Sequence, residues 1–318
     1  MRVLITGGFG FVGGRLGQHL VDCGYEVILG SRKFQEVPNW LPSAEIVQID
    51  WNNKVTLLDV CGDIDIVIHT AGMNAHECEL DPEKAKTFNG DVTANLVKTA
   101  VKQGVKRFFY LSTAHVYRSP LVGTISEYTE TKNIHPYATS HLAGENPVLE
   151  ASENSNMDGI VIRLSNSFGA PAHSHVDCWM LLVNDLCRQA IVTGELVLQT
   201  HGNQVRDFVP LTDVCRAIEY LIQTDTDRLN SSVMNIGSGK PSTVLEITHL
   251  IQDCCMDYLN FKPVINKPAS SELEVDEILD FQMTWLSSSN FILDGEPRLE
   301  IEQLLNFCQV HFSKKNFT

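Results

Sequence analysis

Positive charge is scarce in this 318-residue chain. Lys and Arg together number 24 against 39 Asp and Glu, which gives a formal net charge of −15. A surface of that sign repels the phosphate backbone of nucleic acids, so we expect no nucleic-acid partner. Pro and Gly are few, at 12 and 21 residues, whereas 43% of the chain is hydrophobic, and this composition excludes a disordered or collagen-like protein.

Long hydrophobic runs are also missing. The longest apolar stretches, such as residues 64–68, have the length of a strand, whereas a membrane helix needs roughly 18 apolar residues or more. The N-terminus, MRVLITGG, enters a strand and a glycine turn at once, without an apolar signal segment. The sequence therefore predicts a cytoplasmic protein with no membrane partner.

Cysteine pairs with metal-binding spacing are lacking as well. Nine cysteines are scattered between Cys23 and Cys308, and the adjacent Cys254 and Cys255 do not have the spacing of a zinc clip. An odd number of unpaired cysteines fits a reducing compartment. We expect reduced thiols and no metal site.

The first half of the chain alternates short β-branched runs with helical stretches. The expected strands are residues 3–6, 27–29, 45–49, 65–69, 107–112 and 159–163. The expected helices are residues 11–22, 82–103 and 137–153, with Gly24 and Gly104 placed to end the helices before them. This order predicts an α/β fold, a Rossmann-type doubly wound parallel sheet.

The length predicts two domains. Residues 1–168 are expected to form the dinucleotide-binding domain, with returning segments near 206–236. After Phe168 the pattern changes to a loop with Pro, His and Gly, followed by helices and isolated strands. Residues 169–318 are therefore predicted to form most of a smaller, interleaved C-terminal α+β lobe that binds the substrate.

A glycine-rich segment, TGGFGFVG at residues 6–13, follows the first expected strand and opens the first expected helix. Glycine lets backbone amides approach a pyrophosphate at the positive end of a helix. The segment predicts NAD or NADP binding, and the alternative is an ordinary strand-to-helix turn. The predicted cofactor contacts here are Gly7, Gly10, Phe11, Val12 and Gly13.

The second strand ends in Gly30, Ser31, Arg32 and Lys33, without the carboxylate that holds the ribose hydroxyls in many NAD sites. The guanidinium of Arg32 is suited to the 2′-phosphate of NADP. NADP is therefore slightly favoured over NAD. The alternative is that Arg32 is a solvated loop residue.

Further motifs occur in a fixed order along the chain. They are HTAG at 69–72, LSTAHVY at 111–117, PYATSHLAGE at 136–145, RLSNSFGAP at 163–171, RDFVPLTDV at 206–214 and NIGSG at 235–239. Together with the glycine segment, they make nearly the whole chain resemble the extended short-chain dehydrogenase/reductases that modify nucleotide sugars. The resemblance implies an NAD(P)-dependent enzyme with a nucleotide-sugar substrate, and a homodimer.

The resemblance also implies site residues. Thr113 and Tyr137 occupy the catalytic positions, where a phenol exchanges a proton with the reacting oxygen while hydride passes to or from nicotinamide. The alternative for Tyr137 is packing at a helix start after Pro136. The other implied cofactor contacts are Asp50, Trp51, Thr70, Ala71, Gly72, Asn89, Ser112, Tyr137 and His141.

His141 departs from the family, which places a lysine four residues after the tyrosine. A free histidine titrates near pH 6.5, so the permanent positive charge that lowers the tyrosine pKa is lost. A neutral imidazole still hydrogen-bonds a ribose hydroxyl. We therefore expect a catalytic role for His141, which orients the cofactor, and slower or more pH-sensitive turnover. The alternative is a protein that binds the cofactor with weak or no turnover.

The resemblance also bears on the reaction. Nucleotide-sugar dehydratases of this family place an Asp-Glu pair after the catalytic Thr, where this chain has Ala114 and His115. The remaining reactions are C4 keto reduction and C4 epimerisation. The implied substrate contacts are Thr113, Ala114, His115, Asn166 and Arg206. Asp207 is expected to position the Arg206 guanidinium, and a small non-nucleotide substrate stays open as an alternative.

Overall fold

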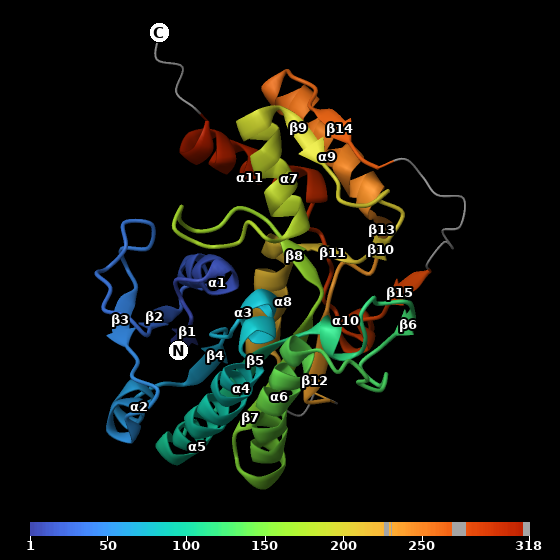
Figure 1. Ribbon diagram of the computed structural model, residues 1–318. Coiled ribbons are helices and arrows are strands. Elements are labelled where there is room, and N and C mark those ends of the chain that lie inside the picture. The colour runs from blue at the N-terminus through green and yellow to red at the C-terminus, as the bar shows by residue number, and fades with distance from the viewer. Residues whose placement is uncertain (226–228, 230, 269–277, 314–318) are drawn as a thin grey trace.

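The computed structural model describes residues 1–225, 229, 231–268 and 278–313. A seven-stranded sheet forms its centre, in the order β12-β7-β5-β4-β1-β2-β3, and every neighbouring pair is parallel. The strands are β1 (Arg2–Thr6), β2 (Glu26–Ser31), β3 (Glu45–Gln48), β4 (Ile66–His69), β5 (Arg107–Thr113), β7 (Asp158–Leu164) and β12 (Val233–Ile236). The predicted Rossmann-type parallel sheet is confirmed (Figure 1).

Helices cover both faces of this sheet. Val3 and Ile5 of β1 pack into one core with α1 (Phe11–Asp22) and α8 (Leu211–Gln223). Leu4 points the opposite way, into a second core that includes residues of α2 (Lys54–Val60), α5 (Thr93–Gln103) and α6 (Pro136–Asn154). Successive strand residues face opposite sides, so a central strand covered on both faces is apolar along its length.

The helix expected at residues 82–103 is not uniform. It consists of α4 (Pro82–Lys86), a π-helical segment η1 (Thr87–Val92) and α5. Asn89 lies buried within η1. Interruptions of this kind occur often at functional sites. Gly104 ends α5 in the left-handed conformation at φ 76°, and Gly24, at φ 86°, follows the last residues of α1, as expected.

The remaining elements carry short sheets and a third core. The paired strands are β8 (Asn166–Phe168) with β11 (Phe208–Pro210), β10 (Val205–Arg206) with β13 (Ser242–Thr243), β9 (Glu195–Val197) with β14 (Val264–Asn266) and β6 (Gly123–Ile125) with β15 (Leu279–Phe281). The third core joins α7 (Leu182–Thr193), α9 (Val244–Leu259) and α11 (Pro297–Phe312). Figure 1 shows these helices at the top, apart from α2, α5 and α6.

Three short helices complete the described chain: α3 (Ala75–Leu80), the 3-10 helix η2 (Ala114–Val116) and α10 (Thr284–Ser288). Among the described residues, no helix has both the length and the apolar character needed to span a bilayer. The carboxyl ends of β1, β4 and β5 lie at one edge of the sheet, because the strands are parallel. The sequence-predicted site residues gather at this edge.

Candidate active site

The glycine loop between β1 and α1 is shaped by close backbone contacts. Gly7 has φ 69°, and a Cβ on it would lie 2.8 Å from the amide nitrogen of Ala71. A Cβ on Gly13 would lie 2.4 Å from the carbonyl oxygen of Gly7. Gly10 caps α1 without a side-chain hydrogen bond, so the first turn presents amides to an incoming anion. This cradle has the shape that the pyrophosphate of a dinucleotide requires, and the predicted contacts Phe11 and Val12 are the first residues of α1.

The segment after β4 is attached to the glycine loop. The hydroxyl of Thr70 donates a 2.7 Å hydrogen bond to the carbonyl of Thr6. Ala71 and Gly72 follow directly, beside Gly7. The structure therefore brings the predicted cofactor residues of the first and fourth strands together at one site.

His69 lies beneath this junction in one defined tautomer. Thr93 donates its hydroxyl proton to the Asn89 carbonyl at 2.8 Å, so it accepts from Nε2 of His69 at 3.0 Å. Nδ1 of His69 then accepts from the Thr6 hydroxyl at 2.6 Å. Burial, with a smaller effect of the nearby His141, lowers the pKa of His69 to about 3. The ring is therefore a neutral structural link.

The predicted contacts on β2 and β3 differ in exposure. Arg32 is exposed just after β2, and its carbonyl accepts from Gln48 at 3.4 Å. Asp50 is exposed and accepts from the backbone of Asn52 at 3.0 Å. Trp51 is half-buried and packs edge-on against His69, with ring centroids 5.8 Å apart. These residues lie at the adjoining strand ends, where Arg32 and Asp50 face solvent.

Asn89 is an internal anchor. Its side-chain oxygen accepts from the Met73 amide at 3.0 Å, and its nitrogen donates to the Ser140 hydroxyl at 3.0 Å. Ser140 in turn donates to the carbonyl of Tyr137 at 3.0 Å. These bonds join the loop after β4 to the first turn of α6. Asn89 therefore positions the loop that the sequence predicts to hold the cofactor.

Thr113 and Tyr137 meet where β5 ends and α6 begins. Tyr137 follows Pro136 at the start of α6, and its amide donates to Nδ1 of His135 at 3.2 Å. Burial raises the pKa of Tyr137, and a hydrogen bond with Thr113 opposes the rise. The Thr113 hydroxyl oxygen also accepts from the His115 amide at 3.2 Å. The two predicted catalytic hydroxyls therefore lie close enough for Thr113 to influence the pKa of Tyr137.

His141 lies one turn further along α6, with its ring centroid 4.6 Å from that of Tyr137 in an edge-on arrangement. Nδ1 of His141 lies 3.2 Å from the hydroxyl of Tyr110. Burial lowers the pKa of His141 to about 4 and raises the pKa of Tyr110 well above its usual value. The phenol therefore donates to Nδ1, and Nε2 of a neutral His141 carries the proton.

His141 faces the cofactor loop. A Cβ on Gly72 would lie 3.7 Å from Cε1 of His141, the ring atom between the two nitrogens. The imidazole is thus placed between Tyr137 and the segment after β4. The sequence left open how far His141 is charged near neutral pH. Burial settles the point, because a pKa of about 4 leaves the ring uncharged at pH 7.

A buried ion pair supports the floor of the site. Glu145 of α6 receives two hydrogen bonds from Arg163 of β7, at 3.1 and 2.7 Å, and one from the Ser112 hydroxyl at 2.5 Å. The Arg163 guanidinium also lies 4.9 Å from the ring centroid of Tyr117. Ser112, a predicted cofactor contact, is buried and bonded inward. This network fixes α6 against β5 and β7.

The predicted substrate contacts come from the end of β5, from the segment after it, and from β8 and β10. Burial lowers the pKa of His115, and the positive charge of Arg206 lowers it further, which places Arg206 near the end of β5. Ala114 is fully buried. The side-chain nitrogen of Asn166 donates to the carbonyl of Asp207 at 3.0 Å, which ties β8 to the segment that carries Arg206.

The expected role of Asp207 is wrong. Its carboxylate accepts from the Ser238 amide at 2.8 Å, the Ser238 hydroxyl at 2.7 Å and the Gly239 amide at 3.0 Å. Asp207 is fully buried, and burial raises its pKa. It holds the NIGSG turn instead of the Arg206 guanidinium, because the unpaired amides of that turn need an internal acceptor.

Three site residues were not predicted from the sequence: Tyr110, His135 and Glu145. His135 could have been predicted from the sequence as a helix-capping residue, since it stands directly before Pro136 at the start of a helix. Glu145 lies eight residues after Tyr137 on α6. Its ion-pair partner, Arg163, lies on strand β7. Tyr110 and Glu145 act through contacts with distant segments, which single-sequence patterns do not show.

A scan against protein-family models matches residues 3–237 to the NAD dependent epimerase/dehydratase family. Among curated proteins, the dTDP-6-deoxy-L-talose 4-dehydrogenase (NAD(P)(+)) of Kitasatospora kifunensis is 31% identical over 258 residues, which cover 79% of this chain and 78% of that protein. The implied family resemblance is thereby confirmed.

Two solved structures have the same fold. The UDP-glucuronic acid 4-epimerase of Bacillus cereus, in complex with NAD, has a TM-score of 0.79 and 20% identity, covering 98% of this chain and 99% of that one. The UDP-glucose 4-epimerase of Thermotoga maritima, with UDP-glucose, also has a TM-score of 0.79 and 20% identity, covering 96% and 98%.

Proposed function

Since the chain belongs to the NAD dependent epimerase/dehydratase family, we propose that it transfers hydride at C4 of a nucleotide-activated sugar, as a keto reductase or a C4 epimerase. The observation that carries this proposal is the meeting of Thr113, Tyr137 and His141 at the edge of the sheet. The proposal does not include elimination of water. Ala114, which follows the catalytic Thr113, has no acidic or basic side chain to contribute to that reaction.

The proposed roles follow from the contacts. The Tyr137 hydroxyl exchanges a proton with the C4 oxygen, and the Thr113 hydroxyl bonds the same oxygen. When bound, the nicotinamide cofactor supplies or accepts the hydride. Nε2–H of His141 donates to a ribose hydroxyl of that cofactor, and Tyr110 maintains this tautomer. The glycine loop cradles the pyrophosphate.

The uncharged His141 sets an expectation for the rate. A cation near a phenol lowers the phenol pKa, and His141 provides none at pH 7 because its own pKa is about 4. Burial moves the pKa of Tyr137 upward. In the oxidising direction, proton transfer from the C4 hydroxyl to Tyr137 is therefore slow at neutral pH and accelerates as the pH rises, whereas in the reducing direction the protonated Tyr137 is ready to donate.

The substrate class is inferred from Arg206 and from the relatives. A guanidinium is suited to a diphosphate, and Arg206 lies close enough to His115 to influence its pKa. The similarity to a dTDP-6-deoxy-L-talose 4-dehydrogenase favours net hydride exchange between C4 and the cofactor over epimerisation. Arg206 then binds the diphosphate while Thr113 and Tyr137 address C4.

The test is an assay of purified protein with UDP- and dTDP-activated sugars and their 4-keto forms, with NADH or NADPH, followed by absorbance and NMR. A reductase consumes the reduced cofactor stoichiometrically, whereas an epimerase forms product without net consumption. We expect Tyr137→Phe to lower turnover by at least about 100-fold while calorimetry still detects the cofactor. An unchanged rate in this variant contradicts the assignment. Unchanged nucleotide-sugar affinity in Arg206→Ala points to a smaller substrate.

A second candidate is a cofactor-binding protein with weak or no turnover. The observation that favours it is the buried and neutral His141. In that case, calorimetry detects the dinucleotide, no nucleotide sugar is converted at any pH, and Tyr137→Phe leaves the biological effect intact. Conversion of one sugar above the Tyr137→Phe background excludes this candidate.

A further inference from the structure

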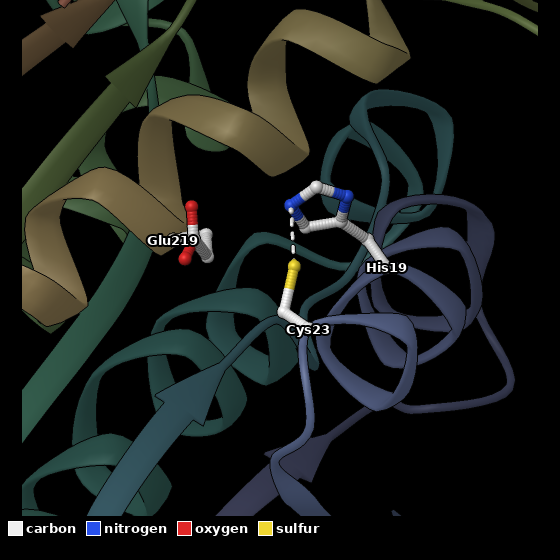
Figure 2. Close-up of side chains that lie close together, drawn as sticks. All are labelled: His19, Cys23 and Glu219. Atoms are coloured by element: carbon white, nitrogen blue, oxygen red, sulfur yellow. Dashed lines mark hydrogen bonds between the residues drawn. The ribbon is translucent and has the colours of Figure 1, made fainter.

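Three side chains with different metal-binding atoms meet at the opposite end of α1 from the glycine loop. His19 lies in the last turn of α1, Cys23 caps that helix, and Glu219 faces them from α8 (Figure 2). Nε2 of His19 is 3.7 Å from Sγ of Cys23, and one ligand atom from each of the three residues lies within 4.8 Å of the others. We propose that this cluster binds a zinc-type divalent cation that joins α1 to α8.

The geometry of the pair on α1 matches a tetrahedral site. With Zn–N near 2.0–2.1 Å and Zn–S near 2.3 Å, a tetrahedral angle separates the two ligand atoms by about 3.6 Å. The observed separation is 3.7 Å. Glu219 is partly exposed, and one of its carboxylate oxygens already lies within 4.8 Å of the ligand atoms of His19 and Cys23. Three protein ligands leave the fourth position to water.

The ligand chemistry selects for zinc and its neighbours. Imidazole, thiolate and carboxylate together suit Zn²⁺ or Co²⁺, whereas Ca²⁺ and Mg²⁺ prefer oxygen ligands alone. Of the nine cysteines, all within the described residues, Cys23 alone is exposed. An ion in solvent therefore reaches this thiol and none of the others.

A supporting contact orients the carboxylate. Gln223, one turn further along α8, donates its side-chain amide to Oε1 of Glu219. Hydrogen bonds of this kind to a ligating carboxylate are typical of protein metal sites, because they fix the ligand before the ion arrives. The same residue also interacts with the Tyr25 hydroxyl. Glu219 is therefore held towards α1.

The local charges favour a cation. Burial lowers the pKa of His19 and raises the pKa of Cys23, and the negative charges of Glu219 and Asp22 act on both groups in the upward direction. Arg15 and Arg216 are the positive groups that act on His19. Their charge is offset by carboxylates elsewhere: Glu300 for Arg15, and Asp213 and Asp294 for Arg216.

Metal binding changes the protonation of one ligand. Burial lowers the pKa of His19, so its lone pair is available at pH 7. Burial is also the main cause that raises the pKa of Cys23, which keeps it a thiol before binding. Formation of the metal–sulfur bond releases the thiol proton to solvent, and no electrons are transferred.

The test is titration of untagged, metal-free, full-length protein with Co²⁺ followed by absorption spectroscopy. We expect a thiolate-to-cobalt charge-transfer band, displaced by one equivalent of Zn²⁺. Cys23→Ser abolishes the band, and His19→Ala and Glu219→Gln weaken affinity by about tenfold or more. The matched control is His249→Ala, because His249 is an exposed histidine on α9, and it leaves the titration unchanged.

A stability measurement separates binding from folding. Melting curves without metal establish that each variant is folded, and we expect Zn²⁺ to raise the melting temperature of the parent and of His249→Ala but not of Cys23→Ser. The proposal is overturned if no charge-transfer band forms, if the band survives Cys23→Ser, or if His249→Ala weakens affinity as much as His19→Ala. Each of these results assigns cobalt to other residues or to none.

Discussion

Tyr110 of β5 donates its phenolic proton to Nδ1 of His141 on α6, across 3.2 Å. The residues are buried, and burial keeps the phenol protonated and the imidazole neutral. One hydrogen bond thus decides which ring nitrogen of His141 carries the proton. In the proposed mechanism that proton, on Nε2, is the one offered to the cofactor ribose.

Tyr110→Phe is the direct test of this relationship. Without the donor, His141 is free to change tautomer, and we expect cofactor affinity to fall by up to about tenfold, the worth of one hydrogen bond. Calorimetric titration with NADH and NADPH measures the effect. Tyr220→Phe is the control, because the Tyr220 hydroxyl bonds the Asn290 amide, on a different part of the fold. Equal effects of both variants would contradict a specific role for Tyr110.

His141→Lys restores a permanent cation beside Tyr137. We expect it to lower the pKa seen in the kcat/KM profile for oxidation of the sugar hydroxyl by about one to three units and to raise the rate of that oxidation at pH 7, since the ammonium favours the ionised phenol that accepts the proton. His141→Gln, which keeps a donor but adds no charge, should retain the parent profile. The measurement is a pH–rate profile of kcat/KM from pH 5 to 10. A profile that does not move in His141→Lys rules out this account of His141.

The parts of this structure that the sequence predicted are those encoded locally. The strand at residues 3–6 and the glycine loop after it depend on neighbouring residues, so periodicity and spacing were sufficient. The π-helical segment around Asn89 was missed, because a single inserted residue in a helix leaves no clear mark in the hydrophobic pattern.

The contacts that the sequence did not predict join residues far apart in the chain. Glu145 and Arg163 pair between α6 and β7, and Asp207 bonds a turn 31 residues further on. The composition of the RDF segment suggested an Arg–Asp partnership, but burial turned Asp207 towards the unpaired amides of Ser238 and Gly239. The energy of satisfying buried donors decided the outcome, and that depends on the tertiary structure.

Acid should destabilise this protein through its buried histidines. Folding lowers the pKa of His141 from 6.5 to about 4 and that of His69 to about 3. Between these values and pH 6.5 the unfolded chain binds more protons, so the stability that is present above pH 6.5 is lost as the pH falls. For His141 alone the loss reaches about 3 kcal/mol at pH 4.

Urea unfolding at pH 4.5, 5.5 and 7 measures this dependence. His141→Gln removes one titrating group, so its unfolding free energy should fall less steeply between pH 7 and pH 4.5 than that of the parent. The comparison uses slopes, which are insensitive to a constant loss of packing. Identical slopes would mean that folding does not lower the pKa of His141.

Arg32 determines the choice of cofactor if it binds the 2′-phosphate. Its side chain is exposed after β2, in a segment without a carboxylate between Gly30 and Lys33. We expect Arg32→Ala to weaken NADPH binding by about tenfold and to leave NADH binding unchanged, because only NADPH carries the phosphate. Lys33→Ala is the neighbouring control. Equal losses for both cofactors in Arg32→Ala would assign Arg32 a role unrelated to the phosphate.

Gly144→Ala tests how tightly α6 is seated against the strand that carries Tyr110. A Cβ at this position would lie 2.3 Å from the Tyr110 hydroxyl and 2.4 Å from the Asn89 carbonyl, and neither group has space to retreat because both are buried. We expect a loss of about 1–3 kcal/mol in unfolding free energy, together with weaker cofactor binding as Tyr110 leaves His141. Gly72→Ala is the matched control for stability, since its Cβ would lie at ordinary contact distances of 3.5 and 3.7 Å from Asn89 and His141. If the melting temperature of Gly144→Ala equals that of Gly72→Ala, the helix has room to shift, and the Tyr110–His141 bond is not held by packing.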